Sequence, residues 1–209
     1  MVRQTLSLAV VMAVAGCAAP GNSQMATPPA PSNAVPQTTT IATPTGRLDV
    51  ESDESAFGFE IPRNWQRLPP PPSKGTLTGI ARVTDPTGLL TCFELKIHPP
   101  GKPDVAPDAG KVRADLQRSG QFIWSRFLNG LSDVEFTESS ARDINGWPFY
   151  EVSVNYTAPN GIKGYIKGAA TMIGIDLYTF QCTVLQQLSA TSQQNEELFL
   201  SSIRRKTGA

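Results

Sequence analysis

The sequence predicts an α+β domain built on an antiparallel sheet. Between Trp147 and Leu185, three segments alternate apolar and polar residues, which is the period of two that a strand shows when one sheet face is buried. The stretch from Asp108 to Leu131 instead has apolar residues every three or four positions, as in a helix with one buried face. A second helical stretch follows Thr191. We therefore expect an antiparallel meander with helices packed against it.

Turn residues separate the three strands of the meander. The first strand begins at Trp147 and ends before Pro159-Asn160-Gly161. Asn-Gly tolerates the positive φ angles of a tight hairpin, so residues 162–173 should return beside the first strand. Gly174-Ile175-Asp176 then leads into the third strand, over residues 177–185.

A strand and a hairpin are expected ahead of the long helix. The alternation over residues 56–61 ends at Pro62, and Trp65 is expected to fold back into the core. Two further alternating segments, over residues 77–83 and 89–97, flank a good turn sequence, Asp85-Pro86-Thr87-Gly88. These two segments should pair.

The long helix has recognisable ends and one unusual interior residue. Asp108 is the expected N-cap, and Gly130 lies near the expected end. Gly120 inside the helix costs about 1 kcal/mol relative to Ala, so we expect a tight packing contact or a break there. A short strand over residues 134–137 should follow.

The last segment is also expected to be helical. Thr191-Ser192-Gln193-Gln194 has the form of a capping box, and Leu198, Phe199 and Ile203 give the following residues one apolar face. The run from Arg204 to Lys206 stands where a helix C-terminus favours positive charge. This helix should cover one face of the sheet.

The N-terminus has the pattern of an export signal. A short charged head precedes an apolar run over residues 5–14, which is too short to span a bilayer. Val14-Ala15-Gly16-Cys17 resembles the lipobox of bacterial lipoproteins, in which two small residues precede a cysteine that is lipidated and becomes the mature N-terminus. Val14 stands where that family most often has Leu. The alternative is an ordinary secretory signal, with Cys17 incidental.

Lipidation would make residues 1–16 a signal peptide and anchor the protein to a membrane through acyl chains on Cys17. Ala18, rather than Asp, after the cysteine resembles the lipoproteins sorted to the outer membrane, facing the periplasm, if the cell has two membranes. Residues 17–52 are rich in Pro, Ala, Thr and Ser and are expected to be a disordered tether. We favour a spacer over a proline-rich recognition segment, because no basic residue accompanies Pro28-Pro29-Ala30-Pro31.

Composition and charge favour one domain that does not bind nucleic acid. After the signal and tether, the rest of the 209-residue chain suits one domain of ordinary size. Lys plus Arg and Asp plus Glu number 18 each, and there is no basic stripe with interleaved aromatic residues.

Cys92 and Cys182 remain after lipidation of Cys17. In an exported domain such a pair tends to form a disulfide, and closing a loop of about ninety residues adds roughly 4 kcal/mol in the chain-entropy model. The alternation, however, puts Cys92 on the side of Glu94 and Lys96, and Cys182 on the apolar side of its own strand. A disulfide and two buried free thiols therefore both stay open.

No catalytic or metal-binding constellation is expected. His98 is the single histidine and lies at a strand end, where we interpret it as solvated. The sequence has no Gly-x-Ser-x-Gly, no Cys-x-x-Cys and no phosphate-binding glycine loop. No cofactor is expected either.

The order of these elements resembles the PsbP-like fold. The resemblance rests on the opening from Phe57-Gly58-Phe59 to Trp65, the strand pair, the long helix, the meander entered at Asn145-Gly146-Trp147-Pro148-Phe149-Tyr150 and the closing helix. It covers residues 53–206 and implies an antiparallel sheet sandwiched by helices (α/β/α). That fold is shared by a photosystem accessory protein, a nuclear-import factor and several bacterial envelope lipoproteins. The resemblance implies no catalytic residues, and most members are binding or assembly factors.

Three hypotheses about function follow. The first is an envelope lipoprotein that binds a protein partner or helps a membrane complex to assemble, without enzymatic activity. The second is a carrier or sensor of a small apolar ligand or lipid, bound in a helix-sheet groove lined by Trp65, Trp124 and Trp147, although such residues are more often core. The third, an enzyme, requires a carboxylate pair or a Ser or Thr nucleophile assembled from distant positions.

Overall fold

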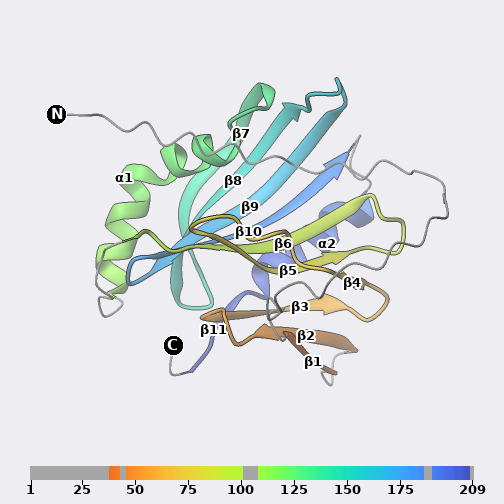
Figure 1. Ribbon diagram of the computed structural model, residues 1–209, viewed down its shortest axis with the longest axis horizontal. Coiled ribbons are helices and arrows are strands. Elements are labelled where there is room, and N and C mark those ends of the chain that lie inside the picture. Colours follow the sequence, from red (N-terminus) through yellow and green to blue (C-terminus); the bar gives the residue numbers. More distant parts are fainter. Residues whose placement is uncertain (1–37, 43–45, 101–107, 186–189, 208–209) are drawn as a thin grey trace, which may run out of the picture.

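The computed structural model describes residues 38–42, 46–100, 108–185 and 190–207. These residues form two antiparallel sheets and two helices (Figure 1). The larger sheet lies at the centre. Helix α1 (Ala109–Phe127) packs on one of its faces, which we call the α1 face. Helix α2 (Ala190–Ser201) and the smaller sheet pack on the other, the α2 face.

The larger sheet has seven strands, and all its pairings are antiparallel. From one edge to the other they are β4 (Gln66–Leu68), β5 (Leu77–Thr84), β6 (Leu90–Ile97), β10 (Asp176–Leu185), β9 (Lys163–Ile173), β8 (Trp147–Thr157) and β7 (Ser132–Ile144). The predicted meander is confirmed as β8, β9 and β10, and the predicted hairpin as β5 and β6. Gly161 has a φ of 80° in the turn between β8 and β9, as predicted, but Asn160 does not have a positive φ, so the turn is not the tight Asn-Gly hairpin that the sequence suggested.

The smaller sheet has the strand order β1 (Thr38–Ala42), β2 (Arg47–Ser52), β3 (Phe57–Pro62) and β11 (Arg204–Arg205). Its first two strands lie inside residues 17–52, so the expected tether is wrong for residues 38–42 and 47–52. Val50, opposite Phe59, is 1% exposed. Leu48 also packs against the core, partly buried. Two apolar residues and backbone pairing with β3 thus order residues 47–52, although their composition favours disorder.

Helix α1 begins and packs as predicted. Asp108 is its N-cap and accepts hydrogen bonds from the backbone amides of Gly110 and Lys111, at 2.9 and 3.1 Å. Gly120 lies in a tight packing contact, because a Cβ added there would be 2.2 Å from Cγ of Tyr150. The helix ends at Phe127, a few residues earlier than expected.

The α1 face of the larger sheet is a tightly packed apolar layer. Trp124 is fully buried, and its Nε1 donates a hydrogen bond to the carbonyl of Tyr150 at 3.3 Å. The indole fits over Gly168 of β9, where an added Cβ would be 2.3 Å from the ring. Two glycines, one on the helix and one on the sheet, therefore let α1 approach closely.

The α2 face carries most of the large aromatic side chains. Phe57 of β3 makes edge-on contacts with Phe149 and Phe180 of the larger sheet, each with ring centroids 5.6 Å apart. Phe59 contacts Phe199 of α2 in the same way, at 4.7 Å. These contacts join both sheets and α2 in one core.

The end of α2 differs from the prediction. Arg204 and Arg205 do not extend the helix but form β11, which pairs with Gly58 and Phe57 of β3. Ser202 Oγ, just before β11, accepts a hydrogen bond from the amide of Glu60 at 2.8 Å. Backbone pairing with β3 is available only to an extended chain, which explains why the helix stops at Ser201.

The fold class also needs correction. The chain is α+β with antiparallel sheets, as predicted, but strands dominate, and the α2 face is covered by β3 as well as by α2 rather than by helices alone. Strand β7, expected as a short strand over residues 134–137, has 13 residues. Neither described helix is long and apolar enough to cross a membrane.

Candidate functional site

A group of charged side chains gathers between α2 and the edge of the larger sheet. We call it the α2 cluster: Arg142 of β7, Glu151 of β8, Lys167 of β9, and Glu196 and Glu197 of α2. The three strand residues share the α2 face, which alternation along each strand imposes on them. The two glutamates are adjacent in α2, which packs on this face of the sheet.

Ion pairs connect the α2 cluster. Arg142 Nε lies 2.5 Å from Glu151 Oε2, and its Nη2 lies 3.4 Å from Glu197 Oε1. Lys167 Nζ is 2.5 Å from Glu197 Oε2. Glu197 therefore connects α2 to two strands, and the pairs are partly exposed, which limits what each contributes to stability.

Burial and charge shift the pKa values of the three carboxyls in different directions. Burial, opposed by the charge of Lys167 and reinforced by that of the neighbouring Glu197, raises the pKa of Glu196 to about 7. Burial also raises the pKa of Glu151 against the opposing effect of Arg142. The hydrogen bond from Lys167 lowers the pKa of Glu197. The Oε1 atoms of Glu196 and Glu151 are buried, and neither has a hydrogen-bond partner in the described part of the chain.

These contacts show that the α2 cluster holds α2 against the sheet. No group of three or more His, Cys, Asp or Glu side chains in the described ranges is arranged to bind a metal ion. The cluster was missed at the sequence level, although Glu151, Ser153, Tyr165 and Lys167 do occur at alternating positions of two neighbouring strands. The alternation shows which side of the two strands is polar, but it does not show that this side contacts α2.

The outer edge beside this cluster is β7. Most of its 13 residues are exposed, and it pairs with β8 on one side. The pairing shifts register between Ser132 and Glu135 and again between Phe136 and Glu138, and it is regular from Glu138 to Ile144. Asp133, beside the first shift, has a φ of 49°.

A second buried carboxyl lies where the two sheets meet. Glu94 of β6 is 2% exposed and accepts a hydrogen bond from Ser55 Oγ, in the turn between β2 and β3. Burial raises the pKa of Glu94 to about 8, although Ser55, Lys206 and Lys96 favour the charged form. Glu94 therefore joins the smaller sheet to the larger one mainly as a neutral acid near pH 7.

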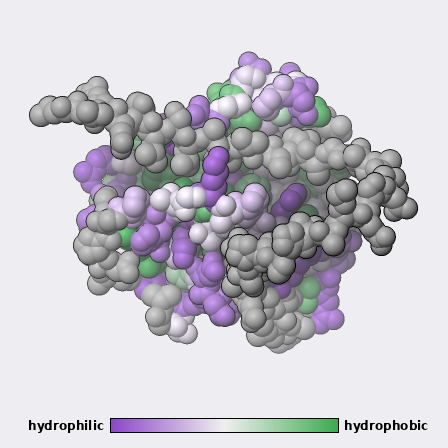
Figure 2. Space-filling model, viewed as in Figure 1, coloured by the Kyte–Doolittle hydropathy of each residue, from purple (hydrophilic) through white to green (hydrophobic). Residues whose placement is uncertain are grey.

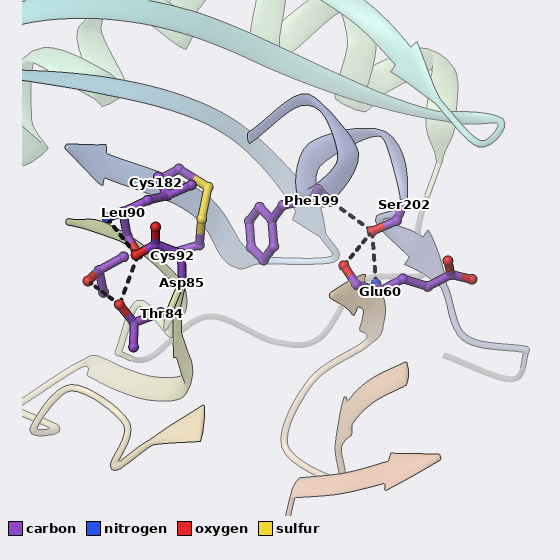
Figure 3. The surroundings of a disulfide bond; sticks show 9 residues. Glu60, Thr84, Asp85, Leu90, Cys92, Cys182, Phe199 and Ser202 are labelled. Atoms are coloured by element: carbon purple, nitrogen blue, oxygen red, sulfur yellow. Dashed lines mark hydrogen bonds between the residues drawn. A yellow bond between two sulfur atoms is a disulfide. The ribbon is translucent and has the colours of Figure 1, made fainter. Parts of the chain in front are cut away.

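Cys92 and Cys182 form a disulfide between β6 and β10 (Figure 3). They lie directly opposite each other, with a Cα–Cα distance of 4.0 Å. Of the two alternatives that the sequence left open, the structure has the disulfide, because the side of β6 that carries Cys92 and Glu94 is the α2 face and is covered by the core. The polar Glu94 made an inner face look like an outer one.

The three tryptophans do not come together in one groove. Trp124 packs on the α1 face, whereas Trp147 lies on the α2 face and donates a hydrogen bond from Nε1 to Thr171 Oγ1 at 2.9 Å. Trp65 is 5% exposed and belongs to the core, as expected. All three are core residues.

His98 is exposed, but it has a partner. Its Nδ1 lies 2.5 Å from Asp176 Oδ1, at the point where β6 ends and β10 begins. The sequence placed His98 at a strand end, and the contact with Asp176 follows from the pairing of β6 with β10.

An open pocket of about 380 Å³ lies beside β11. Its lining is charged and polar: Glu51, Arg204, Arg205, Lys206 and Thr207. Arg204 is held by Asp49 at 2.8 Å and by Glu51 at 2.9 Å. Such a lining does not suit the small apolar ligand considered above.

Few large apolar side chains are exposed among the described residues. They are Leu89, Phe122, Val134 and Ile162. Hydrophilic side chains predominate over the coloured part of Figure 2, and hydrophobic ones are scattered among them. Cys17, the expected lipidation site, lies outside the described residues.

No family model and no curated protein matches this chain. Among solved structures, cyanobacterial PsbP (CyanoP) from Synechocystis sp. PCC 6803 aligns over 86% of this chain and 98% of that one, with 11% identity and a TM-score of 0.51. This similarity confirms the predicted PsbP-like fold.

Two weaker similarities have TM-scores below 0.5. LpqN, involved in cell envelope biogenesis of Mycobacterium tuberculosis, aligns over 80% of this chain and 89% of that one, with 14% identity and a TM-score of 0.44. A structure from Bacteroides thetaiotaomicron VPI-5482 aligns over 73% of this chain, with 10% identity and a TM-score of 0.46. This chain spans 46% of the Bacteroides chain.

Proposed function

We propose that this protein is an exported lipoprotein whose PsbP-like domain is a non-enzymatic binding or assembly factor of the cell envelope. The observation that carries the proposal is Val14-Ala15-Gly16-Cys17, placed directly after the apolar run of an export signal. Lipidation of Cys17 would anchor the chain without a membrane-spanning helix, because two or more acyl chains are enough for stable attachment.

The fold and the disulfide support an exported domain. Disulfides persist in oxidising compartments outside the cytosol, and the bond between Cys92 and Cys182 joins the two central strands β6 and β10. The 20 positions from 18 to 37 separate Cys17 from β1. Fully extended, they reach at most about 70 Å, which lets an anchored domain meet partners within that distance of the membrane.

The described charged groups support a binding role over catalysis. Glu197 binds Arg142 and Lys167 and so holds α2, and Glu94 with Ser55 holds the smaller sheet. These are structural uses of ionisable side chains. If the cell has two membranes, we propose the outer membrane, facing the periplasm, as the site of anchoring.

Crosslinking in intact membranes tests this function. The full-length protein and its Cys17→Ala form are produced in cells, crosslinked, purified and analysed by mass spectrometry, with fatty-acid labelling as a second readout. We expect acyl label on the wild type alone, and an envelope protein that is captured by the wild type and lost with Cys17→Ala. Equal labelling of both forms, or no captured envelope protein, would contradict the proposal.

A further inference from the structure

The edges of the two sheets are not alike. Strand β4 has three residues and is followed by the prolines 69–72, which cannot donate backbone hydrogen bonds. The edges of the smaller sheet are β1, with five residues, and β11, with two. Strand β7, by contrast, has 13 residues and no proline. Short or proline-flanked edges resist the addition of another strand, whereas a long edge accepts it.

The second half of β7 has the geometry that strand addition requires. From Glu138 to Ile144 it pairs with β8 residue by residue, without a register shift. A regular ladder on one side keeps the backbone groups of the other side in the regular order that a new strand needs. The middle of this stretch is Ser139-Ser140-Ala141, whose small side chains leave room for an approaching chain.

From this geometry we infer that the β7 edge, from Glu138 to Asp143, binds an extended segment of the envelope partner as an added strand. The inference rests on the proposed function, because it assumes that such a partner exists. Main-chain hydrogen bonds would supply affinity, and side chains beside the edge would supply specificity.

Charge indicates which kind of segment fits. Asp133, Glu135 and Glu138 are exposed and form no ion pair with the described residues. Arg142 is held by Glu151 and Glu197, and Asp143 by Arg113 at 2.6 Å. The unpaired charge along β7 is therefore negative. A segment with Lys or Arg beside its strand-forming residues would complement it.

The same charges can also be interpreted as protection, because acidic residues and bulges keep edges from pairing. In β7 the two register shifts and the positive φ of Asp133 all lie before Glu138. None of these features interrupts Ser139-Ser140-Ala141. The first half of β7 is thus protected from strand pairing, while its acidic side chains flank a second half that the described residues leave open.

Site-specific photocrosslinking in membranes of cells making the lipidated full-length protein tests this inference. A photoreactive amino acid replaces Ser139 or Ser140 on β7, and matched exposed controls replace Gln66 on β4 and Gln117 on α1. We expect an envelope protein to be crosslinked from β7 at least about fivefold more strongly than from either control. Its crosslinked peptide should carry Lys or Arg.

Charge reversal gives a second readout. Glu135→Lys with Glu138→Lys should weaken capture from Ser140 about tenfold, since like charges then face each other, whereas Glu135→Gln with Glu138→Gln should weaken it less. Thermal melts of each variant show that the fold is kept.

The outcomes separate the two proposals. Capture of an envelope protein from Gln66 or Gln117 but not from β7 overturns the edge inference and leaves the proposed function intact. Capture from β7 of a second copy of this chain, or of a segment without basic residues, also overturns the edge inference. Absence of an envelope protein from every position overturns both.

Discussion

The two faces of the larger sheet are buried by different chemistry. On the α1 face, Trp124 and Tyr150 pack closely against Gly168 and Gly120. The polar contacts there include the hydrogen bond from Trp124 to the Tyr150 carbonyl and the exposed ion pair of Arg113 with Asp143. The α2 face carries the disulfide and aromatic contacts, but also the buried carboxyl of Glu94 and the α2 cluster.

This difference indicates that the two faces respond to different perturbations. A face held mainly by close apolar packing is sensitive to the volume of a side chain. A face that contains buried carboxyls with raised pKa values loses stability as the pH rises. We therefore expect volume changes to disrupt the α1 face, and pH changes to disrupt the α2 face.

Loss of the disulfide should have the largest effect. The bond joins residues 90 positions apart, and Cys92→Ala with Cys182→Ala should lower the free energy of unfolding by about 4 kcal/mol. Urea unfolding of the oxidised wild type and of the double variant measures this. The wild type unfolded with a reductant is the matched control and should resemble the variant. Equal stability of all three would contradict this account of the α2 face.

Glu94 should make stability depend on pH. Its pKa is raised from 4.5 to about 8 in the folded protein, so the folded state holds a proton that the unfolded state releases. The stabilisation is complete below the unfolded pKa and is lost as the pH rises to about 8. We expect the free energy of unfolding of the wild type to fall by on the order of 3 kcal/mol between about pH 5 and about pH 8.

Glu94→Gln removes this titration and should flatten the pH profile of unfolding. Glu196, whose pKa is raised to about 7, contributes with the same sign, so Glu196→Gln should flatten part of the remainder. A wild type that is more stable at about pH 8 than at about pH 5 would show that these carboxyls do not govern the profile.

On the α1 face, the corresponding change is Gly168→Ala. The new methyl group would be 2.3 Å from the indole of Trp124, and overpacking of this kind costs about 2 kcal/mol. The double variant with Trp124→Phe makes room for the methyl group, so adding Gly168→Ala to Trp124→Phe should cost less than adding it to the wild type. Urea unfolding of the four proteins measures the coupling, and additive effects would argue against the close contact.

The smallest effect is expected in the α2 cluster. Glu197→Gln removes the carboxylate that binds Lys167 and Arg142, but these side chains are partly exposed, so the loss should be below about 1 kcal/mol. The loss should shrink further in high salt. Lys111→Ala, which breaks a helical ion pair with Asp115 on α1, is the matched surface control. A much larger effect of Glu197→Gln would mean that the cluster does more than hold α2.

Much of the α1 face could be predicted from the sequence. The period of Val112 and Leu116, the N-cap at Asp108 and the unusual Gly120 are local signals, and each was confirmed. The meander was predicted for the same reason, since its turns carry glycine and asparagine where the chain needs them.

The α2 face was harder to predict because it is assembled from distant segments. Val50 and the short β11 gain order only by pairing with β3, and no local pattern shows this. Cys92 and Glu94 lie on the same side of β6. The polar Glu94 suggests in the sequence that this side is exposed, whereas it is buried. The length of β7 was missed because a strand exposed along most of its length has little apolar alternation.

Native-state hydrogen exchange at about pH 5 and about pH 8 tests the contrast between the faces most directly, once intrinsic exchange rates are divided out. We predict that amide protection in α2 and in β3 falls by more than protection in α1 as the pH rises. Glu94→Gln should remove most of the difference. An equal fall in α1 and α2, or a larger fall in α1, would contradict the assignment of the titratable contacts to the α2 face.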